Sequence, residues 1–359
     1  MIKKRISDIL NGEVKISKFS DIQNEENKVY KIILDDKNNK VINLYVLQNV
    51  RIIISGHTCF SVLKNNHIIE ELCFQSKDLI RKSLSFNKVL SKGYISIFPK
   101  KIKGTSFCLL QDVSQKRNYW HFLYDCIVKL RLVDNLKEIN FDKILIPSTK
   151  QIFQKQIIQA LNIGDKIIDC DGLNVIDLEK LIIADHPYWQ AGNSWFEDTK
   201  QLPFWSVKFL RNKFVNLNSK KKFKKKIFID RSESSSPNNQ IHNLSEVKNF
   251  LSSKNFDILQ FSYLSFEDQV SAFRNAETIV GAHGAAFANA AFSKPKINLI
   301  EIKQKDQKAP FAAVDAHRLS IKMCAQQVKH LLPDHRILRI HFYPKILQLS
   351  LLPLYRHHQ

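Results

Sequence analysis

Residues 278–289 read TIVGAHGAAFAN, and this stretch decides the fold of the carboxyl half of the chain. Its apolar start predicts a buried strand at 278–281, and the small residues that follow predict a helix at 284–291. A strand that runs straight into a helix exposes backbone N–H groups and the positive end of the helix dipole, which favours an anion. Gly281 and Gly284 let a diphosphate approach the backbone closely. We therefore predict a diphosphate or nucleotide site here; the alternative is tight packing of the helix on the sheet.

Strands and helices alternate regularly around this stretch. Apolar runs predict strands at 226–230, 256–261 and 297–302, and helical spacing of apolar residues predicts helices at 244–253 and 266–276. Ser265 is placed to cap the second helix, and Asn243 with Glu246 resembles a capping box for the first. Alternation of this kind is typical of a doubly wound, mostly parallel sheet, so we predict an α/β fold.

The amino-terminal part shows two further patterns. Short apolar runs in the first hundred residues predict strands at 41–50, 51–55 and 94–98. Later, predicted strands at 107–111, 143–147, 166–170 and 178–184 alternate with predicted helices at 119–136 and 150–161. The lysine-rich segment 220–226 is the sharpest boundary, because like charges at that density rarely lie within a packed element.

The segment NYWHFLYD at 118–125 carries the clearest candidates for chemistry. On a helix, His121 and Asp125 are four residues apart, share one face and can hydrogen-bond to each other. Large apolar neighbours surround both, and burial can shift the pKa of either group toward neutrality. A general base that removes a proton from a sugar hydroxyl near pH 7 needs such a pKa. The alternative is a structural His–Asp pair near the start of the helix.

Two charged residues lie where a parallel sheet binds ligands. Arg231 directly follows the predicted strand 226–230, at the carboxyl edge where doubly wound sheets hold their ligands. Its planar guanidinium suits a phosphate. Glu301, on a later strand, is suited to accept hydrogen bonds from ribose hydroxyls. For each residue the alternative is an ordinary ion pair or a surface position.

Composition and charge exclude several classes of protein. The chain has 359 residues, 44% of them hydrophobic and 25% charged, which is typical of a globular protein rather than a disordered one. No uncharged apolar run reaches the roughly 18 residues that predict a membrane span, so we expect a soluble intracellular protein. The six cysteines have neither zinc-site nor disulfide spacing and are predicted to be buried thiols.

The net charge of +21 favours an anionic partner: nucleic acid, an anionic membrane face or a phosphorylated substrate. A lysine-rich composition of ordinary solvated faces is the alternative. The lysines cluster at the boundary segment 220–226 instead of being interspersed with aromatic residues, and the chain has no zinc-finger, RNA-recognition or helix-turn-helix pattern. We therefore predict no nucleic-acid partner.

Several short motifs in a fixed order resemble glycosyltransferase family 61. They are Asn118…His121-Phe122…Asp125, Phe228-Ile229-Asp230-Arg231-Ser232, Asn243-x-x-Glu246, Leu264-Ser265-Phe266-x-x-Gln269, Gly281-Ala282-His283-Gly284-Ala285…Asn289…Phe292 and Ile300-Glu301. The resemblance implies a GT-B arrangement of two Rossmann-like domains facing a cleft, an inverting mechanism and a nucleotide-sugar donor held by the second domain. Similar bacterial proteins serve capsule or lipopolysaccharide assembly. One departure is that residues 236–241 lack an arginine that the family usually carries there.

On this basis we expect four segments along the chain. They are an N-terminal β-rich segment at 1–105, an acceptor-side Rossmann-like domain at 106–218, a donor-binding domain at 219–308 and a compositionally atypical C-terminal tail at 309–359. The tail replaces the last helices that the resemblance implies, and no chemistry is assigned to it.

The resulting hypothesis is a cytoplasmic, metal-independent inverting glycosyltransferase of surface-polysaccharide synthesis. We expect peripheral contact with the anionic face of the inner membrane, where a lipid-linked acceptor lies. The partners are a nucleotide sugar, expected to be UDP-linked, and a glycan or lipid-linked acceptor; no cofactor is expected. The general base is Asp125, or His121 oriented by Asp125. Predicted donor-binding residues are Arg231, Gly281, His283, Gly284, Ala285, Asn289 and Glu301, and predicted acceptor-binding residues are Asn118, Trp189 and Trp195.

Three alternatives stay open. Metal-dependent transfer would use Asp169-Cys170-Asp171, a DxD match. A degenerate family member would bind a sugar nucleotide without turnover, as the missing arginine and the atypical tail suggest. A basic nucleic-acid-binding protein would account for the charge alone.

Overall fold

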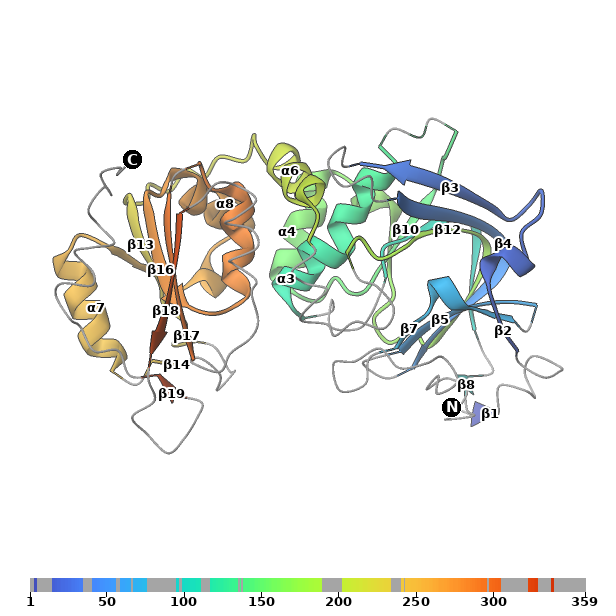
Figure 1. Cartoon of the computed structure of the whole chain (residues 1–359), viewed down its shortest axis with the longest axis horizontal. Helices are drawn as coiled ribbons and strands as arrows, with labels where there is room; N and C mark the ends of the chain where they lie inside the picture. Colours follow the sequence, from blue (N-terminus) through green and yellow to red (C-terminus); the bar gives the residue numbers. More distant parts are fainter. Residues whose placement is uncertain are drawn as a thin grey trace, which may run out of the picture. The chain divides into compact units, whose positions relative to one another are not determined.

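The computed structural model of the chain is shown in Figure 1. It describes residues 3–4, 15–34, 41–55, 59–65, 67–75, 95–96, 99–110, 117–134, 136, 138–188, 202–233, 240–241, 243–295, 297–304, 322–328 and 337–338. The chain divides into two compact units, Met1–Leu210 and Arg211–Gln359. Each unit is a mixture of helices and strands, so the protein belongs to the α/β class that the alternation predicts.

The first unit is built on a ten-stranded sheet. Its order is β11-β10-β9-β12-β4-β5-β6-β2, with β3 beside β4 and β7 beside β5. The strands are β2 (Lys15–Ser17), β3 (Lys28–Ile33), β4 (Val41–Ser55), β5 (Cys59–Lys64), β6 (His67–Ile69), β7 (Phe74–Gln75), β9 (Lys100–Cys108), β10 (Lys143–Ile146), β11 (Ile167–Asp169) and β12 (Val175–Ala184). From β11 to β12 the neighbours are parallel, whereas β12/β4, β4/β5 and β5/β6 are antiparallel. Two short strands, β1 (Lys3–Lys4) and β8 (Ile95–Ser96), form a separate antiparallel pair.

The longest strand, β4, joins regions that are far apart in the sequence. It runs through both predicted strands 41–50 and 51–55 and pairs with β12 from Leu44↔Ala184 to Ile53↔Val175. Apolar residues of β4, β9 and β12 are buried in one cluster, because alternate residues of neighbouring strands point to the same face. A single sheet and a single core therefore combine residues from 1–105 with residues from 106–218.

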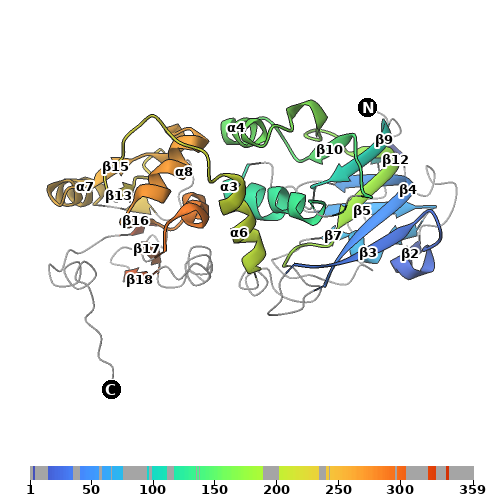
Figure 2. The same ribbon diagram turned by 90° about the horizontal axis from the view of Figure 1, so that it is seen from above.

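The helices of the first unit include an irregular segment after β9. It begins as α3 (Tyr119–His121), widens into a π-helical turn, η5 (Phe122–Cys126), and tightens into a 3₁₀-helix, η6 (Ile127–Leu132). The prediction of a helix at 119–136 is therefore right in position but wrong in its regularity. The other helices in the described part of this unit are η1 (Phe19–Asp21), η2 (Glu70–Leu72), α4 (Ile152–Leu161), η7 (Gly164–Lys166) and α6 (Phe204–Lys213). Helix α6 crosses the boundary between the units. Figures 1 and 2 show α3 and α4 on the same side of the sheet.

The second unit has a parallel five-stranded sheet in the order β15-β13-β16-β17-β18. The strands are β13 (Lys226–Ile229), β15 (Asp257–Leu259), β16 (Thr278–Ala282), β17 (Asn298–Gln304) and β18 (Lys322–Val328). Helices α7 (Leu244–Ser253) and α8 (Phe266–Asn275) lie on opposite sides of this sheet (Figures 1 and 2), as in a doubly wound fold. The short turns η8 (Phe261–Tyr263) and η9 (Ala285–Phe292) follow β15 and β16, and β14 (Gln240–Ile241) pairs with β19 (Ile337–Leu338).

Most predicted elements of the second unit are confirmed, with two corrections. Ser265 caps α8 as predicted, since its hydroxyl accepts a hydrogen bond from Asp268 N at 3.1 Å. The capping box at Asn243 is wrong: the Asn243 side chain donates to Glu246 Oε2 at 3.0 Å and caps no backbone N–H. The segment predicted as a helix at 284–291 is the 3₁₀-helix η9. The strand β18 belongs to the atypical tail and pairs with β17.

The cysteines and the helices add two further observations. Cys73, Cys108, Cys126 and Cys170 are buried, as predicted for cysteines that pack as small apolar side chains. Among the helices that the structure describes, none combines the length and the apolar character that crossing a membrane requires.

Candidate functional site

The irregular helical segment of the first unit positions the predicted general base. Asn118 precedes α3 and caps it, because Asn118 Oδ1 accepts hydrogen bonds from Trp120 N at 2.9 Å and His121 N at 3.3 Å. The next turn is the π-helical η5, which contains Asp125; such turns are frequent at functional sites. Asn118, a predicted acceptor-binding residue, thus fixes the start of the segment through its side-chain oxygen.

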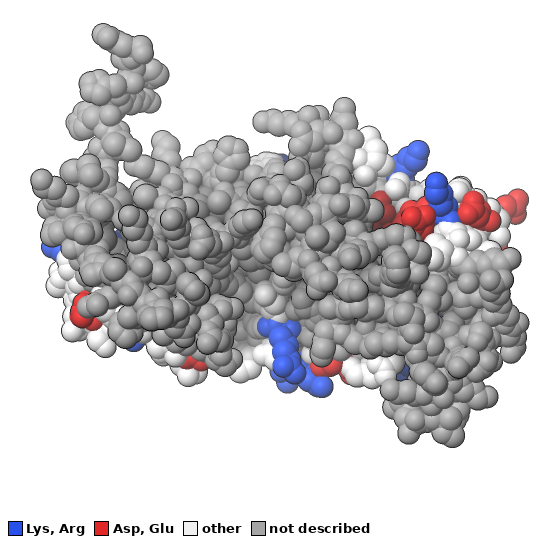
Figure 3. Space-filling view, turned by 60° about the horizontal axis from the view of Figure 1, so that its bottom comes forward, with Lys and Arg blue, Asp and Glu red and all other residues white. Residues whose placement is uncertain are grey.

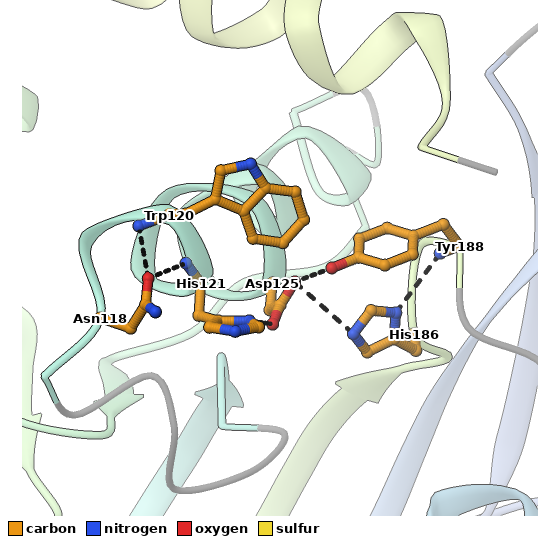
Figure 4. A network of polar contacts seen from close by, with 6 residues as sticks. All are labelled: Asn118, Trp120, His121, Asp125, His186 and Tyr188. Carbon is orange, nitrogen blue, oxygen red and sulfur yellow. Dashed lines mark hydrogen bonds and ion pairs between the residues drawn. The ribbon is translucent and has the colours of Figure 1, made fainter. Parts of the chain in front are cut away.

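Asp125 is the centre of a buried polar network, and Figure 4 shows three side chains that converge on it. His121 Nδ1 lies 2.7 Å from Asp125 Oδ2. Tyr188 donates its hydroxyl to Asp125 Oδ1, and His186 Nε2 lies 3.8 Å from the same oxygen. The predicted pairing of His121 with Asp125 is therefore present, within a larger group.

These neighbours decide the charge of Asp125. Burial alone raises the pKa of this carboxyl, but the charge and hydrogen bond of His121, with help from His186 and Tyr188, hold its pKa below the ordinary value. Asp125 is therefore an anion at neutral pH and a hydrogen-bond acceptor only. A carboxylate with a lowered pKa is a weak base, which favours an orienting role for Asp125 over the role of general base.

The hydrogen-bond partners also assign the tautomers of both histidines. Because Asp125 is an acceptor, His121 donates from Nδ1, so Nε2 is the ring nitrogen that can take up or release a proton. The backbone N–H of Tyr188 points at His186 Nδ1 at 3.4 Å, which places the His186 proton on Nε2, toward Asp125. Of the two predicted roles, this geometry favours His121 as the base and Asp125 as the group that orients it.

His186 and Tyr188 were not predicted as site residues. They follow β12, whose carboxyl end lies beside the carboxyl end of β9, the strand that precedes the Asn118–Asp125 segment. The rule that ligands bind at the carboxyl ends of parallel strands would have indicated them. Predicting this contact from sequence requires knowing that β9 and β12 are neighbours, which the sequence pattern does not reveal.

Aromatic rings and a lysine surround this network. Trp120 packs against Tyr124 at 4.9 Å and Tyr188 at 6.1 Å between ring centroids, and His186 meets Tyr188 edge-on at 4.4 Å. Lys129 is fully buried and donates to the Leu110 carbonyl oxygen at 3.1 Å, which ties the helical segment to the end of β9. Such surroundings strengthen each hydrogen bond, because the local dielectric is low. The predicted acceptor residues Trp189 and Trp195 lie outside the described residues.

The second unit brings Arg231 and the Gly281–Gly284 turn together. Arg231 donates from Nη1 to the His283 carbonyl oxygen, and its guanidinium lies next to Gly284. A Cβ at Gly284 would be 2.6 Å from Arg231 Cζ, so any other residue here would displace the guanidinium from this position. A Cβ at Gly281 would be 2.9 Å from Cβ of Ile229 on the neighbouring strand, so Gly281 allows the close packing of β13 and β16.

The other predicted donor residues are held by partners inside the second unit. His283 Nδ1 lies 2.6 Å from Glu301 Oε1, and Glu301 is completely buried in β17. Asn289 Nδ2 donates to Gln269 Oε1 at 3.1 Å and to the Ala286 carbonyl oxygen at 2.9 Å. Ala285 is the first residue of η9, directly after Gly284. These contacts fix the strand-to-turn geometry around Arg231.

The DxD match and the lysine-rich boundary have local partners as well. Asp169 accepts from Thr149 N at 2.9 Å, and Asp171 pairs with Lys150 at 3.0 Å. In the lysine-rich segment, Lys221 pairs with Asp268 at 2.7 Å. On the face drawn in Figure 3, basic and acidic side chains of the described residues lie close together at one end of the molecule. Part of the positive charge is thus balanced locally.

The comparisons with known proteins agree with the motifs. The family model described as Glycosyltransferase 61 matches residues 119–300, which include both the His121–Asp125 pair and Arg231. No curated protein matches the chain.

Proposed function

Because this chain belongs to glycosyltransferase family 61, we propose that it transfers a sugar from a nucleotide sugar to a hydroxyl of a glycan or lipid-linked acceptor, with inversion at the anomeric carbon. The family establishes the class of enzyme, a glycosyltransferase. The observation that carries the mechanism is the buried network in which Asp125 orients His121.

In the proposed step, His121 Nε2 removes the proton of the acceptor hydroxyl. The acceptor oxygen then forms a bond to the anomeric carbon from the side opposite the leaving group. The bond between that carbon and the diphosphate oxygen breaks, and the nucleoside diphosphate leaves with the electron pair. The imidazolium that forms beside the anionic Asp125 is stabilised by its charge, and it later returns the proton to water.

The second unit is proposed to hold the donor. Arg231 offers a planar cation at the carboxyl edge of the sheet, beside the His283–Gly284 backbone, where it would neutralise charge on the leaving diphosphate. His283 and Glu301 support this turn from within β16 and β17. The GT-B-like arrangement of the units, a UDP-linked donor, a role in surface-polysaccharide synthesis and peripheral contact with a membrane from the cytoplasm are further parts of the proposal.

The test begins with a screen of nucleotide sugars for protection of the full chain against thermal unfolding, because a ligand selective for the native state raises its apparent stability. A protecting donor is then assayed for release of its nucleoside diphosphate in the presence of bacterial surface glycans as acceptors. The wild type should release it, and His121→Ala should bind the donor equally well and release none. Release that survives His121→Ala contradicts the role of His121. If the wild type binds the donor but never turns it over, the chain is a degenerate binder.

A further inference from the structure

The carboxyl edge of the second sheet carries a polar cluster that the predicted donor residues do not include. It is formed by the loop after β13, with Ser232 and Glu233, and by the turn after β15, with Gln260 and Ser262. The two strands are parallel neighbours, with Ile229 opposite Leu259, so both loops leave the sheet at the same edge. This is the edge at which doubly wound sheets bind ligands.

Two hydrogen bonds between side chains join these loops. Gln260 Nε2 donates to Ser232 Oγ at 2.8 Å, and Ser262 Oγ donates to Glu233 Oε1 at 2.9 Å. Bonds at exposed positions add little stability, but they hold both loops in one arrangement before a ligand arrives. The negative charge of Glu233 also acts on Arg231, where it opposes the lowering of the guanidinium pKa by burial. The cluster is thus adjacent to the proposed phosphate site.

Among the residues that the structure describes, one carboxylate oxygen of Glu233 has no hydrogen-bond partner. Oε1 is bonded to Ser262, whereas Oε2 is buried and accepts no hydrogen bond from any residue that the structure describes. A buried acceptor without a donor is costly and rare in native proteins. A ligand hydroxyl placed between the two loops would supply the missing donor.

The exposed ring of Tyr263 lies next to this cluster in the chain. Tyr263 directly follows Ser262 and is 73% exposed, the largest exposed fraction among the large hydrophobic side chains of the described part. A rigid aromatic face at a ligand-binding edge can stack on a nucleobase. Glu301, which the sequence suggests for the ribose, is completely buried and bonded to His283.

We propose that Glu233, and not Glu301, is the carboxylate that recognises the nucleoside of the donor: its Oε2 accepts a hydrogen bond from a ribose hydroxyl, and the base stacks on Tyr263. This inference rests on the proposed function, since it places the nucleoside next to the diphosphate bound by Arg231. The ligand class is a ribonucleoside diphosphate with free 2′- and 3′-hydroxyls. Glu233 thereby becomes a residue that determines specificity.

The test is calorimetric titration of the full chain with UDP, GDP and ADP. The affinity of the nucleotide that binds most tightly is then compared with the affinities of its 2′-deoxy and 3′-deoxy forms. Glu233→Ala should weaken binding of the ribonucleotide roughly tenfold or more, as expected for a hydrogen bond to a charged group. One deoxy form should bind the wild type more weakly by a similar factor, and that difference should disappear in Glu233→Ala. The matched control is Glu277→Ala, an exposed glutamate just before β16, at the opposite edge of the same sheet.

Stability of the free protein separates recognition from a structural role. Because Oε2 accepts no hydrogen bond within the described part of the chain, Glu233→Ala without nucleotide should be as stable as the wild type or more stable. A structural residue would instead lower the unfolding midpoint when it is replaced. Equal affinity of wild type and Glu233→Ala for the ribonucleotide overturns this inference and leaves the proposed function standing. Failure of the wild type to bind any of the three nucleotides overturns the proposed donor site, and this inference with it.

Discussion

Two histidine–carboxylate pairs, one in each unit, have nearly the same contact in different surroundings. His121 Nδ1 is 2.7 Å from Asp125, and His283 Nδ1 is 2.6 Å from Glu301; all four residues are buried. The first pair lies in a π-helical turn, and Tyr188 and His186 reach its carboxylate from a distant segment. The second pair joins the end of β16 to the middle of β17.

This difference shows that the contact alone does not assign the chemistry. Donors from two elements surround Asp125 and keep it anionic, and the bond from Nδ1 leaves Nε2 as the nitrogen of His121 that can exchange a proton. The His283–Glu301 pair ties two neighbouring strands together and supports the backbone that receives Arg231. We therefore propose that the first pair transfers the proton and that the second supports the turn at Arg231. Three substitutions test the assignment, the first of them also at acidic pH.

Asp125→Asn has the largest expected effect. An asparagine has no negative charge to stabilise the imidazolium of His121, and it does not hold the His121 proton on Nδ1. The rate of sugar transfer should therefore fall by roughly 10²–10⁴-fold. Binding of nucleotide by the second unit should be unchanged. Steady-state release of nucleoside diphosphate and calorimetric titration measure the two quantities. Asp134→Asn is the control, because Asp134 is an exposed aspartate close to the same helical segment. Sugar transfer by Asp125→Asn at the rate of the wild type would contradict the role in proton transfer that distinguishes the first pair from the second.

Glu301→Gln should affect stability more than chemistry. The substitution replaces a charge-assisted hydrogen bond in a fully buried site with a neutral one, which costs about 2 kcal/mol of unfolding free energy. Urea unfolding measures this cost, and Glu277→Gln, at an exposed position, serves as its control. Folded Glu301→Gln should still release nucleoside diphosphate at a rate close to that of the wild type. If instead its turnover falls as far as that of Asp125→Asn while its stability is unchanged, the two pairs have the same role.

Tyr188→Phe removes one donor to Asp125 and keeps the aromatic packing against Trp120. Because His121 and His186 still face the carboxylate, we expect a loss of roughly tenfold in turnover, the equivalent of about one hydrogen bond to a charged group. The affinity for nucleotide should not change. Turnover equal to that of the wild type would mean that the hydroxyl of Tyr188 is not needed for catalysis and that the residue contributes only through the packing of its ring. Tyr124→Phe, another buried tyrosine of the first unit, is the matched control.

The comparison also shows what the sequence could and could not predict. The His121–Asp125 pair was predictable because its members are four residues apart, and the alternation at 226–302 gave the second sheet because its strands follow one another locally. Tyr188 is 63 residues from Asp125, and Arg51 on β4 pairs with Asp177 on β12 across 126 residues. Such contacts depend on which strands are neighbours. The π-helical turn was missed because its apolar spacing over a few residues resembles that of an α-helix.

The smallest expected effect is on stability in acid. Folding lowers the pKa of Asp125, whereas in the unfolded chain the carboxyl titrates near its ordinary value of about 4. The network therefore contributes its full stabilisation above about pH 4, and this contribution is lost as the pH falls through the lower pKa of the folded state.

Urea unfolding of the wild type and Asp125→Asn at a series of acidic pH values measures this contribution. The difference in unfolding free energy between the two proteins should narrow as the pH falls below about 4, since the wild-type carboxyl then becomes protonated and neutral like the amide. The difference between the wild type and Asp134→Asn, at an exposed position, should vary much less over the same range. A wild-type advantage over Asp125→Asn that persists unchanged at the lowest pH would mean that the charge of Asp125 is not what the surrounding donors stabilise, and the distinction between the two pairs would then rest on geometry alone.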